Sequence, residues 1–398
     1  MNDKLAINGG KALRKKYLPY GHQWIDNKDI SEVTKVLKSD FITQGPKIKE
    51  FEEVVAKYCN IKYAVAFSSG TAALHSAAFT AGIKQNDEAI TSPMTFVASS
   101  NCVLYLNGTV KFADIKKDTY NINPNEIKKR ITKKTKVLIP VDYAGQPCDL
   151  DEVNEIANEN NLIVIEDASH AIGAEYKGKK IGGLTDLTIF SFHPVKHITT
   201  GEGGMVLTNN EEFYEQLLMF RTHGITKNPK KMNKNEGRWY YEMQTLGYNY
   251  RLTELQCALG LSQFKKIDKF IKRRREIVKK YNKAFKDINE IIIPYEKPDV
   301  KSSYHLYVIQ LRLEKLKAGR KQIFDALRAE NIGVHVHYIP VHLQPYYMKH
   351  FGFKKGEFPV AENYYERCLT LPLYPQMSDE DIDDVIHAVK KIINYYGK

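Results

Sequence analysis

The sequence of 398 residues has no long apolar run, few cysteines and no low-complexity stretch. Without about 20 consecutive apolar residues it lacks a membrane-spanning segment, and its charged N-terminal segment lacks the apolar core of a signal peptide. The cytoplasm is therefore the expected location. The balance of 43% hydrophobic and 27% charged residues also excludes disordered and fibrous proteins.

The cysteines are odd in number and lie far apart, at Cys59, Cys102, Cys148, Cys257 and Cys368. An odd count argues against a disulfide framework, and this spacing is not typical of a metal site. We therefore expect buried, reduced thiols and no bound metal ion.

The net charge of +12 is compatible with nucleic acid, a membrane surface or an anionic substrate as the partner. The lysines are scattered along amphipathic segments such as the helix expected over residues 126–134. This scatter favours a solvated surface, so neither nucleic acid nor a membrane is expected as a partner. A basic protein would nonetheless attract a nucleotide diphosphate.

Short apolar segments alternate with helical patterns in the first half of the chain. The length favours two packed domains, and the alternation predicts an α/β domain with a mostly parallel sheet. Ligands collect at the carboxyl ends of such strands, so the polar residues that follow them are candidates. The expected strands cover residues 63–67, 88–91, 110–113, 137–141, 162–165, 187–190 and 205–208.

The second part of the chain has a different pattern. Residues 253–285 predict one long amphipathic helix with a basic outer face. Beyond it we expect a compact α+β layer, with strands at 305–312 and 334–338 and helices at 321–330 and 379–395. The expected division is a large domain over 1–252, followed by a linking helix and small domain over 253–398. Residues 226–238 are too polar for a core and predict a loop.

Lys196 follows the strand at 187–190, within the segment FSFHPVKHITTGEGG. The glycines after it allow close backbone approach to a bulky group, and a lysine in such a site can form an imine. Taken alone, Lys196 is equally one of many surface lysines. Asp167 ends the apolar segment LIVIE, so its carboxylate would emerge at the ligand-binding edge, whereas Glu166 alternates away. Pyridoxal phosphate (PLP) requires such an anion beside its pyridinium nitrogen, although a helix N-cap is the other reading.

The turn at 68–71 lies between an expected strand and a helix that begins with AALHSAA. A helix N-terminus binds anions and would suit the phosphate of PLP, although ordinary capping explains the same residues. Ser191 offers another hydroxyl. Phe96 follows a strand end and could lie over the pyridine ring or pack in the core, and His170 could donate to the cofactor phenolate or cap the chain turn. The order of these residues along one α/β domain jointly favours a PLP site.

The chain resembles the DegT/StrS family of sugar aminotransferases over nearly its whole length. The motifs that carry the resemblance are SSGTAAL, TFVAS, VDYAG, EDASHAIG, SFHPVK, GEGG, RTHG, GYNYRLTELQCALG and GVHVHYIPVHLQPYY. The resemblance implies the PLP-dependent transferase fold type I and a homodimer whose active sites lie at the interface.

The resemblance also assigns cofactor contacts. It implies that Lys196 carries PLP as a Schiff base and that Asp167 faces the pyridinium nitrogen. The position of His170 is often glutamine in the family, so this sequence departs from the pattern at the phenolate contact. The remaining implied contacts are Gly70, Thr71 and Ser191 with the phosphate, Phe96 stacked on the ring, and Asn249 reaching the phosphate of the partner subunit.

The substrate expectation rests on the same resemblance. Several segments look most like the transaminases that form UDP-4-amino-4,6-dideoxy-N-acetyl-β-L-altrosamine for pseudaminic acid, and glutamate is the implied donor. The freed Lys196 amine would then act as the base. The candidate contacts with the UDP-sugar are Thr43, Gln44, Gly45, Arg238 and Tyr338, with Lys227, Lys230, Lys231, Lys234, Arg251 and His342 as further candidates.

The sequence is also compatible with other functions. Legionaminic acid, perosamine and bacillosamine pathways use related sugar 4-aminotransferases. A related dehydratase class replaces the Schiff-base lysine with histidine, but this sequence keeps Lys196, and His193 is three residues away. A non-catalytic PLP-binding regulatory protein is a rival from another class. A dinucleotide-binding oxidoreductase is disfavoured because no G-x-G-x-x-G turn follows the first strand.

Overall fold

The computed structural model describes residues 4–398, so the first three residues of the expected large domain lie outside the described residues. Its centre is a seven-stranded sheet in the order β1-β9-β8-β5-β4-β2-β3. All the expected strands of the large domain are present, with boundaries that shift by at most two residues. They are β1 (Tyr63–Phe67), β2 (Glu88–Thr91), β3 (Thr109–Phe112), β4 (Thr135–Ile139), β5 (Ile163–Asp167), β8 (Leu187–Ser191) and β9 (Gly204–Thr208).

The sheet is mostly parallel, as predicted. Only β9 runs antiparallel to its neighbours β1 and β8, while the pairs from β3 across to β8 are parallel. Successive side chains of a strand point to opposite faces, so Val65 and Ala66 of β1 enter different apolar cores. The sheet is therefore buried on both sides.

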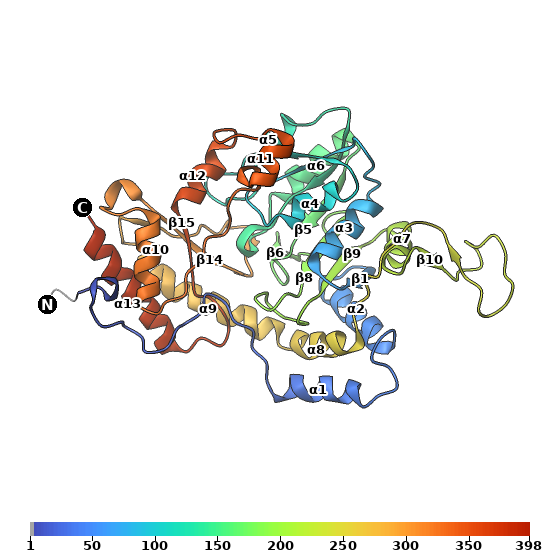
Figure 1. Cartoon of the computed structure of the whole chain (residues 1–398), viewed down its shortest axis with the longest axis horizontal. Helices are drawn as coiled ribbons and strands as arrows, with labels where there is room; N and C mark the ends of the chain where they lie inside the picture. Colours follow the sequence, from blue (N-terminus) through green and yellow to red (C-terminus); the bar gives the residue numbers. More distant parts are fainter. Residues whose placement is uncertain (1–3) are drawn as a thin grey trace.

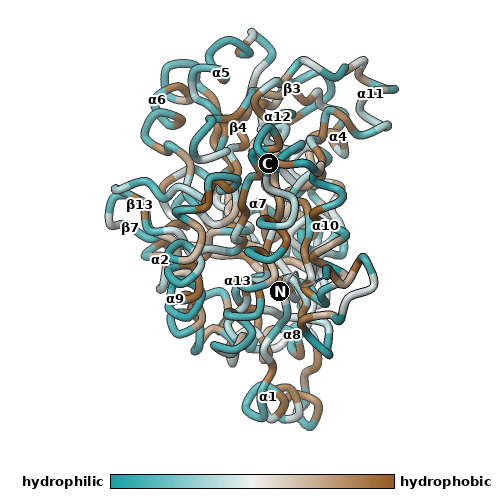
Figure 2. Tube along the Cα trace, turned by 90° about the vertical axis from the view of Figure 1, so that its left-hand side faces the viewer, coloured by the Kyte–Doolittle hydropathy of each residue, from teal (hydrophilic) through white to brown (hydrophobic). Residues whose placement is uncertain are grey.

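Helices cover both faces of this sheet (Figure 1). The helices α2 (Pro46–Cys59), α6 (Leu150–Asn160) and α8 (Glu254–Phe264) contribute to one core, through residues such as Phe51 and Val153. The other core receives α3 (Gly70–Thr80), α4 (Ala98–Leu104) and α7 (Glu211–Arg221). Figure 2 shows the apolar segments in the interior and hydrophilic ones on the outer helices.

The C-terminal part forms the expected α+β layer. A three-stranded sheet, in the order β12-β14-β15, packs with helices that close the third apolar core. Shorter elements complete the layer and carry the chain between its parts. The bounds are β12 (Ile291–Ile292), β14 (Tyr307–Leu311), β15 (Cys368–Leu371), α10 (Arg320–Ala329), α11 (Pro345–Phe351), α12 (Pro359–Arg367) and α13 (Asp379–Tyr396).

The single helix expected over 253–285 is wrong, because the structure has α8 followed by a separate α9 (Ile267–Phe285). At the break, the amide of Lys266 donates to the carbonyl of Gln263. The ammonium of Lys266 pairs with Asp26 and Asp29, at the start of α1 (Asn27–Leu37). Lys266 is thereby held against the start of α1 at the point where α8 has ended and α9 begins.

Two further elements are shorter than expected. The strand predicted over 334–338 is reduced to one bridge between His335 and Thr370, and the carbonyl of His337, the next residue that would face that strand, accepts from the hydroxyl of Tyr143 instead. The helix expected over 126–134 spans only α5 (Pro124–Lys128). Beyond it Thr132 binds Glu88 and the hydroxyl of Thr135, which ends the helix.

The predicted loop over 226–238 is confirmed: residues 227–238 contain no helix or strand. The loop lies between the short strands β10 (Ile225–Thr226) and β11 (Glu242–Met243), which pair to form an arm. In Figure 1 this arm extends from α7 away from the rest of the molecule. It also exposes large apolar side chains, among them Trp239, Met243 and Leu246.

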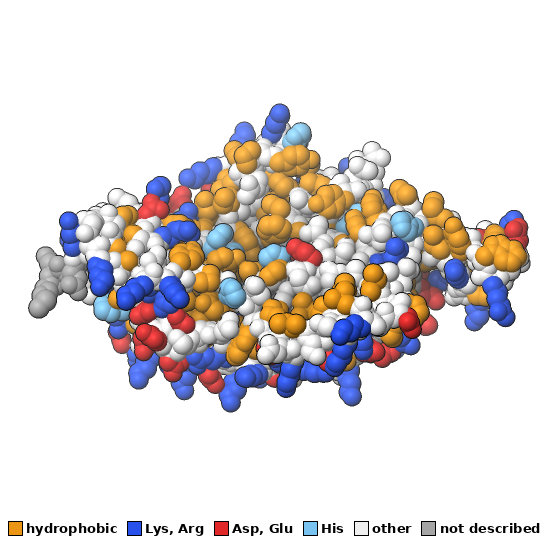
Figure 3. Space-filling model, turned by 60° about the horizontal axis from the view of Figure 1, so that its bottom comes forward, with side chains coloured by type: hydrophobic (Ala, Val, Ile, Leu, Met, Phe, Trp, Pro, Cys, Tyr) orange, Lys and Arg blue, Asp and Glu red, His pale blue; other side chains and the backbone are white. Residues whose placement is uncertain are grey.

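The surface is rich in lysine and arginine. Figure 3 shows these side chains along the rim of one face, with Asp and Glu among them, while apolar side chains and histidines gather nearer its middle. Within residues 4–398, no helix is long and apolar enough to cross a membrane.

The two parts of the chain are joined by contacts on either side of residue 252. Core residues of α8 and α9, such as Cys257 and Phe270, lie in the same apolar core as Ala66 and Leu138 of the sheet. The strand β13 (Val300–Lys301) pairs with β6 (Glu175–Tyr176), which also pairs with β7 (Lys179–Lys180). The expected division at residues 252 and 253 stays a prediction.

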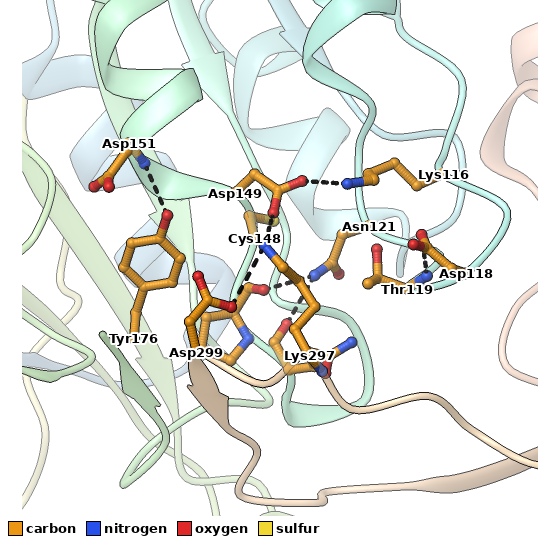
Figure 4. Close-up of polar contacts among 12 residues, drawn as sticks. Lys116, Asp118, Thr119, Asn121, Cys148, Asp149, Asp151, Tyr176, Lys297 and Asp299 are labelled. Carbon is orange, nitrogen blue, oxygen red and sulfur yellow. Dashed lines mark hydrogen bonds and ion pairs between the residues drawn. The ribbon is translucent and has the colours of Figure 1, made fainter. Parts of the chain in front are cut away.

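Asp149 is a charged tie between the two parts. One carboxylate oxygen accepts from Lys116 at 2.7 Å, and the other accepts from Lys297 at 2.5 Å (Figure 4). Burial alone would raise the pKa of Asp149, but the hydrogen bonds from the two lysines outweigh it and hold that pKa below its usual value. The ionised form of Asp149 therefore stabilises the fold.

We predict that Asp149→Asn lowers the free energy of unfolding by about 1 kcal/mol at pH 7, after allowing for solvent around both lysines. A carboxyl with a lowered pKa stabilises the folded state fully above the ordinary value of about 4, and this is lost as the pH falls through the lower folded-state pKa. The difference between variant and wild type should therefore shrink in acid. Urea unfolding between pH 3 and 7 measures it.

Asp151→Asn is the matched control. Asp151 pairs with Lys177 close to the Asp149 tie, but both side chains are more than half exposed. Its loss should leave the unfolding free energy nearly unchanged, because exposed ion pairs contribute little. Equal effects of the two substitutions would contradict a specific role for Asp149.

Candidate active site

A cavity of about 550 Å³ lies at the carboxyl ends of β5 and β8, beside the start of α3. This is the edge at which an α/β sheet collects ligands. Most of the predicted cofactor residues line it together with Tyr338. These are Gly70, Thr71, Phe96, Asp167, His170, Ser191 and Lys196.

Asp167 is the last residue of β5 and is 5% exposed. Its Oδ2 atom accepts a hydrogen bond from the hydroxyl of Ser99 at 2.6 Å, and its Oδ1 atom accepts from the amide of Ser169 at 3.2 Å. Glu166 points to the other face, where it accepts from Thr188. The expected alternation of the two acids is confirmed, because Asp167 lines the cavity and Glu166 does not.

Lys196 lies in the turn after β8, where its amide donates to the carbonyl of His193 at 2.9 Å. Burial lowers the pKa of the Lys196 ammonium to about 8, and the nearby charge of Asp167 opposes this shift. Compared with an exposed lysine, the uncharged amine at pH 7 is then more abundant by roughly two orders of magnitude. Lys196 is therefore suited both to attack a carbonyl and to exchange protons.

The turn before α3 makes close contact with two strands. Ser69 caps the helix by accepting from the amide of Ala72, which leaves the first amides of α3 facing the cavity. A Cβ atom on Gly70 would lie 3.1 Å from the Cβ of Ser191, and one on Gly204 would lie 2.4 Å from the carbonyl oxygen of Ser69. Only glycine allows this packing, which places backbone N–H groups and the Ser191 hydroxyl around one end of the cavity.

The opposite wall combines aromatic rings and histidines. Phe96 is at the rim and is 57% exposed, and the hydroxyl of Tyr338 lies 3.0 Å from Nε2 of His170. Burial keeps the pKa of His170 well below its usual value, so its ring is neutral. Nδ1 of His170 has no hydrogen-bond partner among the described residues. The ring of His170 is therefore a neutral part of the cavity wall.

Some predicted residues do not line this cavity. Asn249 and Arg238 are exposed, in or beside the arm. Thr43, Gln44 and Gly45 lie in the turn before α2. His342 is buried 3.0 Å from Glu362 and does not face the cavity. One chain alone therefore does not assemble all the predicted contacts, and the roles of these residues stay predictions. The further candidates Lys227, Lys230, Lys231, Lys234 and Arg251 are likewise absent from the cavity wall.

The sequence interpretation missed several residues of the cavity wall. Ser99 lies three residues after Phe96, in the first turn of α4, and nothing in its local pattern indicates a contact with Asp167. His305 and His337 come from the C-terminal part and join the wall through tertiary contacts. Burial holds the pKa of both rings below their usual value.

The chain matches the model of the DegT/DnrJ/EryC1/StrS aminotransferase family over residues 23–390. It belongs to this family. The Bacillus subtilis spore coat polysaccharide biosynthesis protein SpsC is 43% identical over 96% of this chain and 98% of that protein. A UDP-4-amino-4,6-dideoxy-N-acetyl-β-L-altrosamine transaminase of Campylobacter jejuni is 40% identical over 96% of this chain and 99% of that protein.

Solved structures give the same result for the fold. Helicobacter pylori PseC, an aminotransferase of pseudaminic acid biosynthesis, superposes with a TM-score of 0.89 at 33% identity, covering 96% of this chain and 100% of that one. A Streptococcus pneumoniae protein described as a sugar aminotransferase, solved in its PLP form, gives a TM-score of 0.88 at 31% identity, covering 95% and 99%. The expected fold type I, aminotransferase class and PLP cofactor are confirmed at the level of the family.

We predict that, in protein freed of cofactor, Lys196 reacts with an amine-selective reagent with a pH midpoint near 8, the value to which burial lowers its pKa. Asp167→Asn should move this midpoint to lower pH, because it removes the charge that opposes the effect of burial. Brief labelling across pH 6–11, followed by peptide mass spectrometry, measures the midpoint. Lys177, whose pKa is raised chiefly by its hydrogen bond with Asp151, is the internal control and should label at higher pH. A Lys196 midpoint at 10 or above would contradict the assignment.

Proposed function

We propose that this protein transfers an amino group from glutamate to carbon 4 of a UDP-linked 4-keto-6-deoxy-N-acetylhexosamine. The product would be UDP-4-amino-4,6-dideoxy-N-acetyl-β-L-altrosamine, for pseudaminic acid biosynthesis. One observation carries the proposal: a single cavity has the Lys196 amine, the Asp167 carboxylate and the N-terminus of α3 in its walls. This donor set matches the aldehyde, the ring nitrogen and the phosphate of PLP.

The residues present fit PLP. Gly70 packs against Ser191 without a Cβ atom, and the first amides of α3, with Thr71 and Ser191, would hold the phosphate. Asp167 would keep the ring nitrogen protonated, and Phe96 would cover the ring. The free Nδ1 atom of His170 would face the phenolate side. When bound, PLP supplies an aldehyde that accepts an amino group and a ring that withdraws electrons from the reacting carbon.

Lys196 moves the proton in both halves of the reaction. When it is not bonded to PLP, the Nζ atom would accept the proton from the α-carbon of glutamate. In the second half it delivers a proton to carbon 4 of the sugar. A pKa of about 8 suits both directions, because proton transfer is efficient when the pKa of the group lies near the working pH. Tyr338, held at 3.0 Å from His170, closes the wall beside this proton path.

The substrate class rests on the relatives and on charge. The altrosamine transaminase of Campylobacter jejuni aligns over almost the whole of both chains. The net charge of +12 would attract a nucleotide diphosphate, and the arm carries Arg238 among its exposed residues. We place Thr43, Gln44 and Gly45 beside the sugar. The second candidate is another nucleotide-sugar 4-aminotransferase, because the spore coat polysaccharide protein of Bacillus subtilis is the more similar of these two relatives.

We also propose a homodimer with shared active sites. Asn249 is exposed and does not reach the cavity of its own chain. The arm that precedes it exposes Trp239, Tyr241, Met243 and Leu246, and an exposed apolar surface of this kind suits a protein partner. In the dimer Asn249 would bind the cofactor phosphate of the partner subunit. A cytoplasmic location stays a prediction.

We predict that the purified protein, supplied with PLP, has a visible absorbance that glutamate bleaches and that Lys196→Ala lacks. Incubation with glutamate and a panel of UDP-linked 4-keto sugars should give one preferred amino sugar, identified by mass spectrometry and NMR. Lys180→Ala, a lysine outside this cavity, is the matched control and should keep the absorbance. A wild-type protein that stays colourless with PLP would refute the proposal, and a different preferred sugar would refute only the substrate.

We predict that Lys196→Ala and Asn249→Ala chains, each poorly active alone, recover activity when they are co-expressed. In a symmetric dimer with sites shared between subunits, each mixed dimer contains one site without either substitution. About half of the dimers that form at random are mixed, so about a quarter of wild-type activity is expected. If both residues served the site of their own chain, no intact site would form. Absence of recovery in a verified mixed dimer therefore contradicts the shared site.

A further inference from the structure

Asp167 is the end of a chain of hydroxyl groups. The hydroxyl of Thr95 lies 2.7 Å from that of Ser99, which in turn lies 2.6 Å from Oδ2 of Asp167. The three residues are 3%, 0% and 5% exposed, respectively. Thr95 and Ser99 come from the end of the β2–α4 connection and the first turn of α4, whereas Asp167 ends β5. The contact therefore joins two segments that are remote in sequence.

The chemistry of these groups fixes which hydroxyl donates and which accepts in each hydrogen bond. An ionised carboxylate only accepts hydrogen bonds, so Ser99 must donate its single hydroxyl proton to Asp167. Ser99 can then only accept from Thr95. The carbonyl of Phe96 is a longer alternative acceptor for Ser99, at 3.3 Å, and the shorter contact with a charged acceptor is the stronger one. Both hydroxyl protons therefore point toward Asp167.

The other ionisable groups around Asp167 do not take the place of the Ser99 hydroxyl as a hydrogen-bond donor. Glu166 accepts from Thr188 on the opposite face. Burial raises the pKa of Glu166 and of its neighbour Asp142, so this pair adds little negative charge. Burial also raises the pKa of Cys102 and Tyr338, which keeps both neutral. Lys196 is the cationic group that interacts with Asp167, and it is occupied when it is bonded to the cofactor.

We propose that Thr95 and Ser99 are positioning residues, forming a hydroxyl relay that holds the carboxylate of Asp167 in place and aimed at the ring nitrogen of PLP. This inference rests on the proposed function, because it assumes that Asp167 faces that nitrogen. Ser99 acts through Asp167 and does not itself contact the reacting atoms. Thr95 donates a hydrogen bond to the Ser99 hydroxyl oxygen, which strengthens the hydrogen bond from Ser99 to Asp167.

The test measures PLP binding to cofactor-free protein by absorbance titration, independently of turnover. Ser99→Ala should raise the dissociation constant for PLP about tenfold, since it removes a hydrogen bond to a charged group. Thr95→Val, which keeps the side-chain shape, should raise it about twofold to threefold.

Two controls separate the relay from general packing. Ser100→Ala removes the neighbouring buried hydroxyl, which donates to the carbonyl of Val97 and accepts from Tyr347, and should leave PLP affinity unchanged. The second control is the 1-deaza analogue of PLP, in which carbon replaces the ring nitrogen. This ligand has no group for Asp167 to pair with, so wild type and Ser99→Ala should bind it equally.

The outcomes distinguish this inference from the proposed function. If the wild-type protein fails to bind PLP, both the relay and the proposed function are refuted. If wild type binds PLP and Ser99→Ala binds it equally well, or is weakened to the same degree for PLP and its deaza analogue, the relay is overturned alone. Should Ser99→Ala fail to fold, as judged by circular dichroism, Thr95→Val decides: affinity equal to that of Ser100→Ala overturns the relay.

Discussion

The structure depends on compensating the carboxylate of Asp167, which is only 5% exposed in the wall of the cavity. A buried charge is costly unless hydrogen bonds and an opposite charge compensate it. Ser99 and Ser169 supply hydrogen bonds to its two oxygens, and Lys196 supplies the opposing charge. These donors come from three segments, so α4, the turn after β5 and the turn after β8 must all be in place before Asp167 can be buried as an anion.

The parallel sheet meets this requirement through its direction. Strands β5 and β8 are neighbours and run parallel, so their carboxyl ends lie at one edge and bring Asp167 and Ser191 together. The antiparallel β9 then returns beside β8 and β1, placing Gly204 against Ser69. The end of the cavity beside α3 is therefore shaped by backbone packing, and its side chains are small because larger ones would collide.

Local pattern was enough to predict the strands of the seven-stranded sheet and to place Lys196 and Asp167 after two of them, because continuous apolar runs mark buried strands and the residues after them lie at the ligand edge. The same reasoning could not find Ser99 or His305, whose positions follow from contacts between remote segments. It also failed at Lys266, where pairing with α1 interrupts a continuous helical pattern. The roles of Asn249 and Thr43 were expected only from family resemblance and stay predictions.

The C-terminal part is attached to the cavity through the segment that leads into β14. The hydroxyls of Ser302 and Ser303 donate to the carbonyls of Gly145 and His170, and the ring of His197 lies 3.1 Å from the carbonyl oxygen of Ser303. These contacts bring His305 into the wall next to both His170 and Lys196. Because one short segment both joins the two parts of the chain and completes the cavity, movement between the parts would change the surroundings of Lys196 directly. The geometry of the site therefore depends on how the C-terminal part packs against the rest of the chain.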